Sequence, residues 1–276
     1  TGVLNLGECT SLTSIGESAF HRCSNLTSIT LPSSLISIGK GAFKDCSGLT
    51  GKLDFSNCTS LTSIGEWAFY GCNDLTSITL PDSLMSIGER AFYQCSGLTS
   101  ITLPDSLMSI GEYAFYGCSN LQPSTTDDNG VKYLGSEQNP YLVLWDGTGI
   151  TNSSYTVNPD CKIICPSAFS GCDVLTSITL PEGLKSIGDY AFQDCSGLTT
   201  VDLSNCTSLT SIGMHAFRYC SGLTSITLPE RLTSIGEYAF SSCSKLTEVI
   251  IDSEYVYTNA TSTSACGYLF GNSSIT

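Results

Sequence analysis

One repeated unit dominates the sequence. Leu98–Cys118 reads LTSITLPDSLMSIGEYAFYGC, and Leu75–Cys95 is a near copy of it displaced by 23 residues. Self-similarity at a fixed period of about 20–50 residues is the signature of a solenoid, in which successive copies stack on one another. The repeat therefore predicts a chain of stacked coils, each of which completes its core only against its neighbours.

Within the unit, the spacing of apolar residues predicts a strand followed by turns. Ser100–Leu103 alternates polar and apolar residues, which is the period of a strand with one buried face. Pro104 has no N–H to donate and is expected to end that strand. Leu107–Ile110 predicts a second extended or turning edge, and Gly111 permits the bend that follows. Glu112–Gly117 contains no β-branched residue, which predicts one short helical turn.

The connections between successive copies determine how the coils stack. The strands of successive copies are expected to run parallel, roughly 4.8 Å apart. A crossover between parallel strands is right-handed in nearly every case. The sequence therefore predicts a right-handed superhelix of about ten coils, with a parallel β-sheet on the concave face and short helical turns opposite.

Nine of the 15 cysteines recur at one place in the repeat, three residues after the Phe of an Ala-Phe pair. These are Cys23, Cys46, Cys72, Cys95, Cys118, Cys172, Cys195, Cys220 and Cys243. Such a column is expected to hold small buried thiols that fill a turn. Disulfides between neighbouring copies are the minor alternative, because parallel Cβ vectors fit the required dihedral poorly. A zinc site is less favoured still, because no Cys or His pair has the spacing of a zinc finger.

An insertion interrupts the repeat. Val131–Leu134 and Tyr141–Trp145 are short apolar runs joined by a turn-rich segment, which predicts a β-hairpin built onto a coil. The predicted organisation is leucine-rich coils over 1–121, the insertion over 122–160, further coils over 161–251, and a C-terminal cap or a truncated following segment over 252–276.

Composition narrows the class of partner. The net charge of −14 and the pI near 4.3 argue against binding to nucleic acid and to anionic membrane surfaces. No apolar run is long enough to span a bilayer, and Thr1 begins inside a repeat-like segment without a signal-peptide pattern. We therefore expect no transmembrane segment, and we expect the sequence to be a piece of a longer protein.

The sequence offers no catalytic grouping. The two histidines, His21 and His215, stand at different positions of distant copies and are expected to be solvated surface residues. Asp127–Gly130 is predicted to be a turn, because it lacks the alternating oxygen ligands and terminal Glu of a calcium loop. The many Ser and Thr hydroxyls have no neighbouring base. We therefore predict a protein that is not an enzyme, with no catalytic residue, no metal and no cofactor.

The unit L-x-x-I-x-L-P-x-x-L-x-x-I-G-x-x-A-F-x-x-C resembles the BspA-like leucine-rich repeat family. Nine A-F-x-x-C matches extend the resemblance over most of the chain, and the N-G-V-K-Y-L-G and N-P-Y-L-V-L segments look like an insertion found in that family. The resemblance implies a leucine-rich repeat solenoid that is exposed at the cell surface or secreted by a host-associated microbe. It also implies a role in adhesion to host proteins or to other cells.

The positions on either side of Ala-Phe vary most between copies and form the predicted binding surface. The Ser and Thr rows on the strands vary little, which suits β-propensity and solubility better than recognition. Tyr and Trp are favoured as interface anchors because they bring a large rigid area with a polar tip. The candidate binding residues are Trp67, Tyr70, Tyr93, Tyr113, Tyr116, Tyr190 and Tyr238. The alternative is that these rings only cover the edge of the core between coils, and the sequence does not decide between the two.

These patterns together predict a non-enzymatic adhesion or recognition module that binds over an extended solenoid surface. Its partner would be a host or neighbouring-cell surface protein or an extracellular-matrix protein. Two alternatives stay open. One is carbohydrate binding by the outer aromatic residues, and the other is a structural spacer that holds another domain away from a cell wall.

Phe115→Ala is predicted to destabilise the fold by about 3–5 kcal/mol, because it leaves a cavity between neighbouring coils. Thermal or denaturant unfolding measures the cost. A melting temperature equal to that of the unaltered chain would contradict the predicted burial of this Phe position.

Overall fold

The computed structural model describes residues 2–251 as a solenoid of parallel strands with about 11 turns, close to the number expected. The chain forms two compact units. The first holds the residues up to Ser124 together with Leu134–Pro140, and the second holds Thr125–Tyr133 and the residues from Tyr141 onward. The predicted solenoid is confirmed. The boundaries drawn at 121, 160 and 251 stay predictions, and the predicted cap over 252–276 lies outside the described residues.

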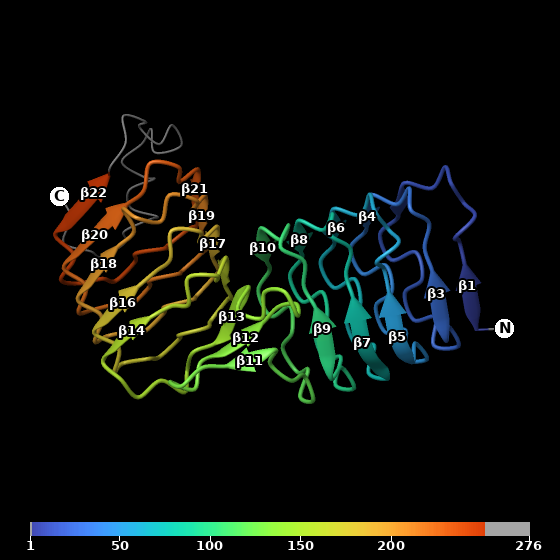
Figure 1. The fold of residues 1–276 in the computed structure, drawn as a ribbon, viewed down its shortest axis with the longest axis horizontal. Coiled ribbons are helices and arrows are strands. Elements are labelled where there is room, and N and C mark those ends of the chain that lie inside the picture. The colour runs from blue at the N-terminus through green and yellow to red at the C-terminus, as the bar shows by residue number, and fades with distance from the viewer. Residues whose placement is uncertain (1, 252–276) are drawn as a thin grey trace. The chain divides into compact units, whose positions relative to one another are not determined.

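The first unit has two rows of parallel strands, which run side by side in Figure 1. One row consists of β1 (Val3–Asn5), β3 (Ser28–Thr30), β5 (Gly51–Asp54), β7 (Leu75–Thr79) and β9 (Ser100–Thr102). The other consists of β2 (Ser14–Ile15), β4 (Ser37–Ile38), β6 (Ser63–Ile64), β8 (Ser86–Ile87) and β10 (Ser109–Ile110). Equivalent residues pair across copies, for example Ile78 with Ile101 and Ile64 with Ile87. The predicted turning edge is therefore a strand in its own right.

The second unit repeats this arrangement. Its first row consists of β14 (Ser154–Thr156), β16 (Ser177–Thr179), β18 (Thr200–Asp202), β20 (Ser225–Leu228) and β22 (Glu248–Ile251). Its other row runs through β11 (Thr125–Thr126), β12 (Lys132–Leu134), β13 (Val143–Asp146), β15 (Ile163–Ile164), β17 (Ser186–Ile187), β19 (Ser211–Ile212) and β21 (Ser234–Ile235). Each row therefore gains one parallel strand with each repeat, as the period requires.

The segments around Ala-Phe are consecutive tight turns, and residues 2–251 contain no helix, so the predicted short helical turns need correction. Their N–H groups alternate between two kinds of partner. Ala42 and Lys44 donate to carbonyls three residues earlier, whereas the intervening Phe43 donates to the Ala68 carbonyl of the next copy at 2.8 Å. A helix would use such donors within the segment. The alternation leaves every second donor free to join neighbouring coils.

This alternation is accompanied by a left-handed backbone at two positions of each copy. The residue before Ala-Phe and the residue before Cys have φ values of +52° to +77°. A positive φ at the third residue of a tight turn is the geometry of a type II turn, which favours Gly. Fourteen of these positions hold a residue other than Gly, and each such residue costs roughly 1–2 kcal/mol in this conformation. The stacking of the coils must offset that strain.

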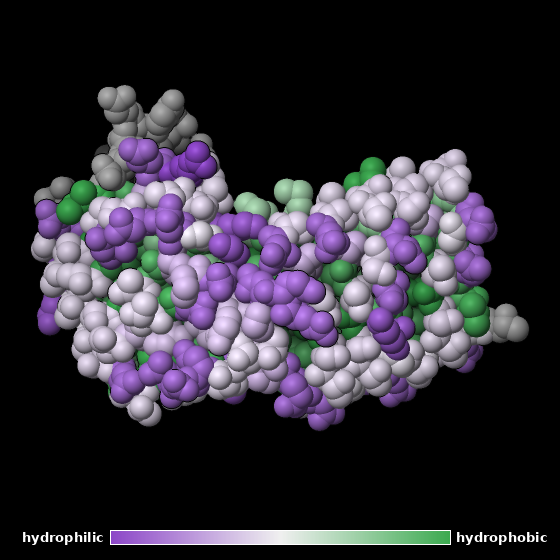
Figure 2. All heavy atoms as spheres, viewed as in Figure 1, coloured by the Kyte–Doolittle hydropathy of each residue, from purple (hydrophilic) through white to green (hydrophobic). Residues whose placement is uncertain are grey.

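A column of Phe rings forms the centre of each unit. In the first unit the rings stack with centroids 5.2–5.7 Å apart, in the order Phe20, Phe43, Phe69, Phe92 and Phe115. In the second unit Phe169, Phe192, Phe217 and Phe240 stack at 5.0–5.4 Å. Phe115 is 6% exposed, which confirms the burial of its position. On the face in view in Figure 2, polar and weakly polar residues predominate and apolar ones form small separate patches.

The repeat cysteines line the same core. Eight of the nine are buried, and Cys23 of the first copy is exposed. The Cys95 thiol donates to the Phe69 carbonyl of the preceding copy at 3.1 Å, and the other buried members of the first unit repeat this contact. Burial raises the pKa of Cys118 to about 12, so this thiol stays protonated and unreactive at neutral pH. All 14 described cysteines are free thiols.

After the first copy, the Gly of the S-I-G segment is needed for close approach between coils. A Cβ on Gly111 would lie 2.4 Å from the backbone nitrogen of Glu89, and one on Gly88 would lie 2.5 Å from that of Glu66. Neither glycine has a positive φ. Contact with the preceding coil, more than freedom to bend, therefore explains the repeated Gly.

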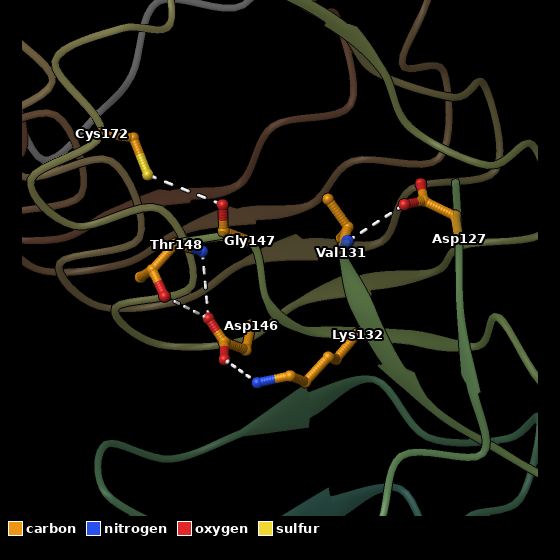
Figure 3. Close-up of polar contacts among 7 residues, drawn as sticks. All are labelled: Asp127, Val131, Lys132, Asp146, Gly147, Thr148 and Cys172. Atoms are coloured by element: carbon orange, nitrogen blue, oxygen red, sulfur yellow. Dashed lines mark hydrogen bonds and ion pairs between the residues drawn. The ribbon is translucent and has the colours of Figure 1, made fainter. Parts of the chain in front are cut away.

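The insertion is built onto the second row of the second unit. β11 and β12 pair antiparallel around a turn at Asp127–Gly130, and β12 lies beside β13. Figure 3 shows the Asp127 carboxylate accepting the N–H of Val131 at 3.0 Å and the Lys132 ammonium reaching Asp146 at 2.8 Å. The predicted turn is confirmed, and the two apolar runs of the predicted β-hairpin form the neighbouring strands β12 and β13. β11 adds an antiparallel strand that the sequence did not predict.

Two buried hydroxyls hold this turn against the solenoid. The Tyr155 hydroxyl on β14 donates to the Asp127 carboxylate at 2.6 Å and lies 2.5 Å from the Tyr133 hydroxyl on β12. Burial raises the pKa of Tyr133 to about 12, so its hydroxyl stays protonated across the physiological range. These polar contacts add to the burial of apolar side chains of the insertion, such as Val131 and Leu144.

Ser167→Gly and Ser170→Gly form a matched pair on one coil. Ser167 has a φ of +60°, whereas the φ of Ser170 lies outside the left-handed region. Gly removes the strain at residue 167 but gains nothing at 170, so we expect S167G to be neutral or stabilising and S170G to cost about 0.5–1 kcal/mol. Denaturant unfolding measures both variants. A larger loss of stability in S167G than in S170G would contradict the strained-turn geometry.

Candidate recognition surface

The residues beside Ala-Phe stand on the outer side of the turns because the pair itself is buried. Ala91 and Phe92 are fully buried, while Arg90 and Tyr93 on either side are partly exposed. Stacking aligns each flanking position into a column. In the first unit the leading column, before Ala-Phe, comprises Ser18, Gly41, Trp67, Arg90 and Tyr113. The trailing column, after Ala-Phe, comprises His21, Lys44, Tyr70, Tyr93 and Tyr116.

Tyrosines stack face to face along the trailing column. The ring centroids of Tyr70 and Tyr93 lie 5.0 Å apart with an interplanar angle of 2°, and those of Tyr93 and Tyr116 lie 5.2 Å apart. Tyr113 of the leading column meets Tyr116 edge to face at 5.6 Å. Such pairs contribute about 0.5–1.5 kcal/mol beyond the area they bury. The two columns therefore form one continuous aromatic surface.

Cations cover several of the remaining ring faces. The Lys44 ammonium lies 4.9 Å from the centroid of Trp67 and 4.7 Å from that of Tyr70. The Lys40 ammonium lies 4.8 Å from Trp67, and the Arg90 guanidinium lies 5.0 Å from Tyr113. Cation–π contacts of this kind contribute about 0.5–1 kcal/mol at exposed sites. They also fix the positions of long, flexible side chains.

The most exposed part of this surface lies on the coil that ends at Cys118. Tyr113 is 39% and Tyr116 59% exposed, whereas Trp67, Tyr70 and Tyr93 are half-buried. The Trp67 indole N–H is itself buried and has no hydrogen-bond partner among the described residues. The surface therefore has exposed rings at Tyr113 and Tyr116, and at Trp67 it has a buried indole N–H without a hydrogen-bond partner among the described residues.

The second unit has a shorter aromatic stack in its leading column. His215 lies between Tyr190 and Tyr238, with ring centroids 5.0 Å and 5.2 Å away. Burial and the nearby Arg218 guanidinium lower the pKa of His215, while the carboxylates of Asp189 and Glu237 oppose that shift. The Nδ1 atom of His215 is buried without a hydrogen-bond partner among the described residues. A neutral ring is therefore favoured in the folded state.

The seven predicted binding residues thus fall into two groups. The structure brings Trp67, Tyr70, Tyr93, Tyr113 and Tyr116 together in the first unit, and it places Tyr190 and Tyr238 around His215 in the second. The sequence analysis did not include Lys44, Arg90 or His215 among the candidate residues. These three residues occupy the same two repeat positions as the predicted binding residues. An alignment of the repeats could therefore have identified them.

The hydroxyl rows of the strands are exposed to solvent. Ser100 and Thr102 are exposed on either side of the buried Ile101. The Thr99 hydroxyl donates to the Thr76 carbonyl of the preceding copy at 3.0 Å, and Thr at the same position repeats this bond in the second unit. Thr side chains at this position therefore join coils and have a structural role.

Groups suited to chemistry are sparse in the described part of the chain. Residues 2–251 contain no cluster of three or more His, Cys, Asp or Glu side chains placed to hold a metal ion. His21 contacts Asp45 at 3.5 Å in the first unit, and His215 belongs to the second. No helix within the described ranges is long and apolar enough to cross a membrane.

The stacked parallel strands, repeated Leu positions and outward turn columns define a leucine-rich repeat solenoid. A family model described as the BspA type leucine rich repeat region matches six copies, over residues 52–138 and 148–270. The chain belongs to this family. No curated protein matches the sequence.

Several solved structures are similar to this chain. One is a leucine-rich repeat protein from Eubacterium ventriosum, 25% identical over 93% of this chain and 75% of that one, with a TM-score of 0.44. Another is the leucine-rich repeat protein of T. pallidum, 26% identical over 67% of this chain and 71% of that one, with a TM-score of 0.41. A leucine rich cell surface protein from Faecalibacterium prausnitzii is 24% identical over 97% and 81%, with a TM-score of 0.33.

His215 is expected to make stability depend on pH. The pKa of His215 is lower in the folded chain than in the unfolded one. Its contribution to the free energy of unfolding is therefore complete above about pH 6.5 and is lost as the pH falls through the pKa of the folded chain. We expect denaturant unfolding to show a smaller loss of stability between about pH 7.5 and 5 in His215→Tyr than in the unaltered chain. His21→Gln controls for losing a histidine elsewhere. Equal pH dependence in H215Y and the unaltered chain would contradict this assignment.

Proposed function

We propose that this chain is a non-enzymatic recognition module that binds a protein partner through the leading and trailing columns of its first unit. The observation that supports this most directly is the Tyr113–Tyr116 pair, two exposed aromatic side chains in edge-to-face contact. Exposed Tyr residues on a rigid scaffold favour binding because little conformational entropy is lost when they are covered. Tyr190 and Tyr238 are a separate candidate contact in the second unit.

The proposed setting is the cell surface or the medium around the cell, and the proposed partner is a host, neighbouring-cell or extracellular-matrix protein. Membership of the BspA-type family supports this setting, because the resemblance implies adhesion. A solenoid also presents an extended surface of the kind that protein partners cover.

The arrangement of the rings favours a protein over a carbohydrate. A sugar binds aromatic residues by stacking on a free ring face, but Tyr70, Tyr93 and Tyr116 present their faces to one another. Lys44 also lies over Tyr70 and Trp67. What the columns display outward is mostly ring edges and hydroxyls, which suit contact with apolar side chains and peptide groups.

A structural spacer is the third candidate function. A spacer has no need for large aromatic side chains in solvent, and Tyr116 stays 59% exposed in spite of its ring contacts with Tyr93 and Tyr113. The recognition proposal accounts for that exposure, whereas the spacer proposal does not.

Binding to an array of purified extracellular-matrix and cell-surface proteins tests the proposal. We expect Tyr116→Ala and Tyr113→Ala each to weaken binding about tenfold, equivalent to about 1.4 kcal/mol, because both rings are exposed anchors. Tyr219→Ala is the matched control, since Tyr219 is 40% exposed in the second unit and belongs to neither aromatic stack. Circular dichroism and thermal melting confirm that each variant is folded.

Three outcomes would contradict the proposal. One is that no protein on the array binds. Another is that Y116A and Y219A weaken binding equally. The third is a glycan-array signal that disappears in Trp67→Ala and Tyr116→Ala, which would establish the carbohydrate alternative.

A further inference from the structure

Lys44 has an unusual position within the aromatic surface. It occupies the trailing column one coil before Tyr70, and its half-buried side chain extends toward the next coil. Its ammonium lies 4.9 Å from the Trp67 centroid and 4.7 Å from the Tyr70 centroid. Two rigid rings therefore fix where this positive charge stands.

The charge of Lys44 has no carboxylate to balance it. The other cations of this surface are paired: Lys40 lies 2.6 Å from Glu66, Arg90 contacts Glu89, and Arg22 lies 3.7 Å from Asp45. Among the described residues, no Asp or Glu oxygen lies within 4.0 Å of the Lys44 ammonium. Two aromatic rings, and no carboxylate of the described residues, therefore surround this cation on the proposed binding surface.

A second unsatisfied donor lies beside it. The indole N–H of Trp67 can only donate, and it has no acceptor among the described residues. A buried donor without a partner costs about 1–3 kcal/mol. Trp67 is also the ring over which the Lys44 ammonium lies. The Lys44 ammonium therefore lies over a ring whose own N–H lacks an acceptor among the described residues, and the ring faces leave ammonium hydrogens available for a carboxylate.

From this arrangement we infer that Lys44 is an anchor for an Asp or Glu side chain of the protein partner. The partner carboxylate would accept hydrogen bonds from the Lys44 ammonium, whose position the Trp67 and Tyr70 rings fix. A hydrogen bond between two charged groups is shorter and stronger than one between neutral groups. The inference rests on the proposed function and adds the chemistry of the partner: an acidic residue next to apolar residues that cover Tyr70 and Tyr93.

The test uses an array of 12-residue peptides in which Asp or Glu stands beside apolar residues, with Asn and Gln versions as the neutral set. We expect the chain to bind members of the acidic set and to bind them less tightly as salt is raised from about 0.05 to 0.5 M, because salt screens the charge pair. Lys44→Gln should weaken this binding about tenfold and reduce its dependence on salt. Trp67→Phe should also weaken it, because Phe gives the Lys44 ammonium a weaker cation–π contact than Trp does.

Lys52→Gln is the matched control. It removes the same charge from the same unit, but Lys52 lies on β5 and pairs with Asp54 at 2.9 Å, outside both columns. Equal binding by K44Q and K52Q, or equal binding of the acidic and neutral peptide sets, would overturn the inference. If the inference fails in this way but Y116A still weakens binding to a protein on the first array, the proposed function stands without the inference. If the chain binds sialylated glycans and none of the peptides, both the inference and the proposed function are overturned.

Discussion

The contact between one coil and the next is the interaction on which the rest of this structure depends. Phe rings stack at 5.0–5.7 Å along the centre of each unit, and every second N–H of the surrounding turn donates to the following coil. Neither contribution exists within a single copy. A coil therefore gains its core and half of these hydrogen bonds only by stacking, which is why the repeat must continue for the chain to fold.

The same spacing produces the proposed recognition surface. Because the Phe column sets the distance between coils, residues on either side of it are brought to within stacking distance on the outside as well, and Tyr70 and Tyr93 lie 5.0 Å apart. The leading column also has the strained backbone, since Trp67 and Tyr113 have φ values of +56° and +55°. Core packing thus holds large side chains in a conformation that would be costly in an isolated turn.

Departures from this regular packing are concentrated in a few polar groups. Three of the four buried side-chain atoms that lack a hydrogen-bond partner in residues 2–251 belong to neighbouring coils of the second unit, at Gln193, His215 and Arg218. The fourth is the Trp67 indole nitrogen of the first unit. All four residues occupy the leading or trailing positions. The columns beside Ala-Phe therefore combine tight packing with incomplete hydrogen bonding, whereas the carboxylate of Asp127 in the insertion is well satisfied.

The sequence by itself determined the solenoid, its period, the buried Phe and Cys positions and the outward columns, because each follows from apolar spacing repeated copy after copy. It did not reveal that the turn around Ala91 and Phe92 is non-helical, because local propensity says nothing of N–H groups that bond to another coil. It identified Trp67 and Tyr70 as candidates but not Lys44, whose role depends on ring faces that only stacking brings together. Tertiary structure decided pairs such as Lys40 with Glu66, because these partners come from different coils.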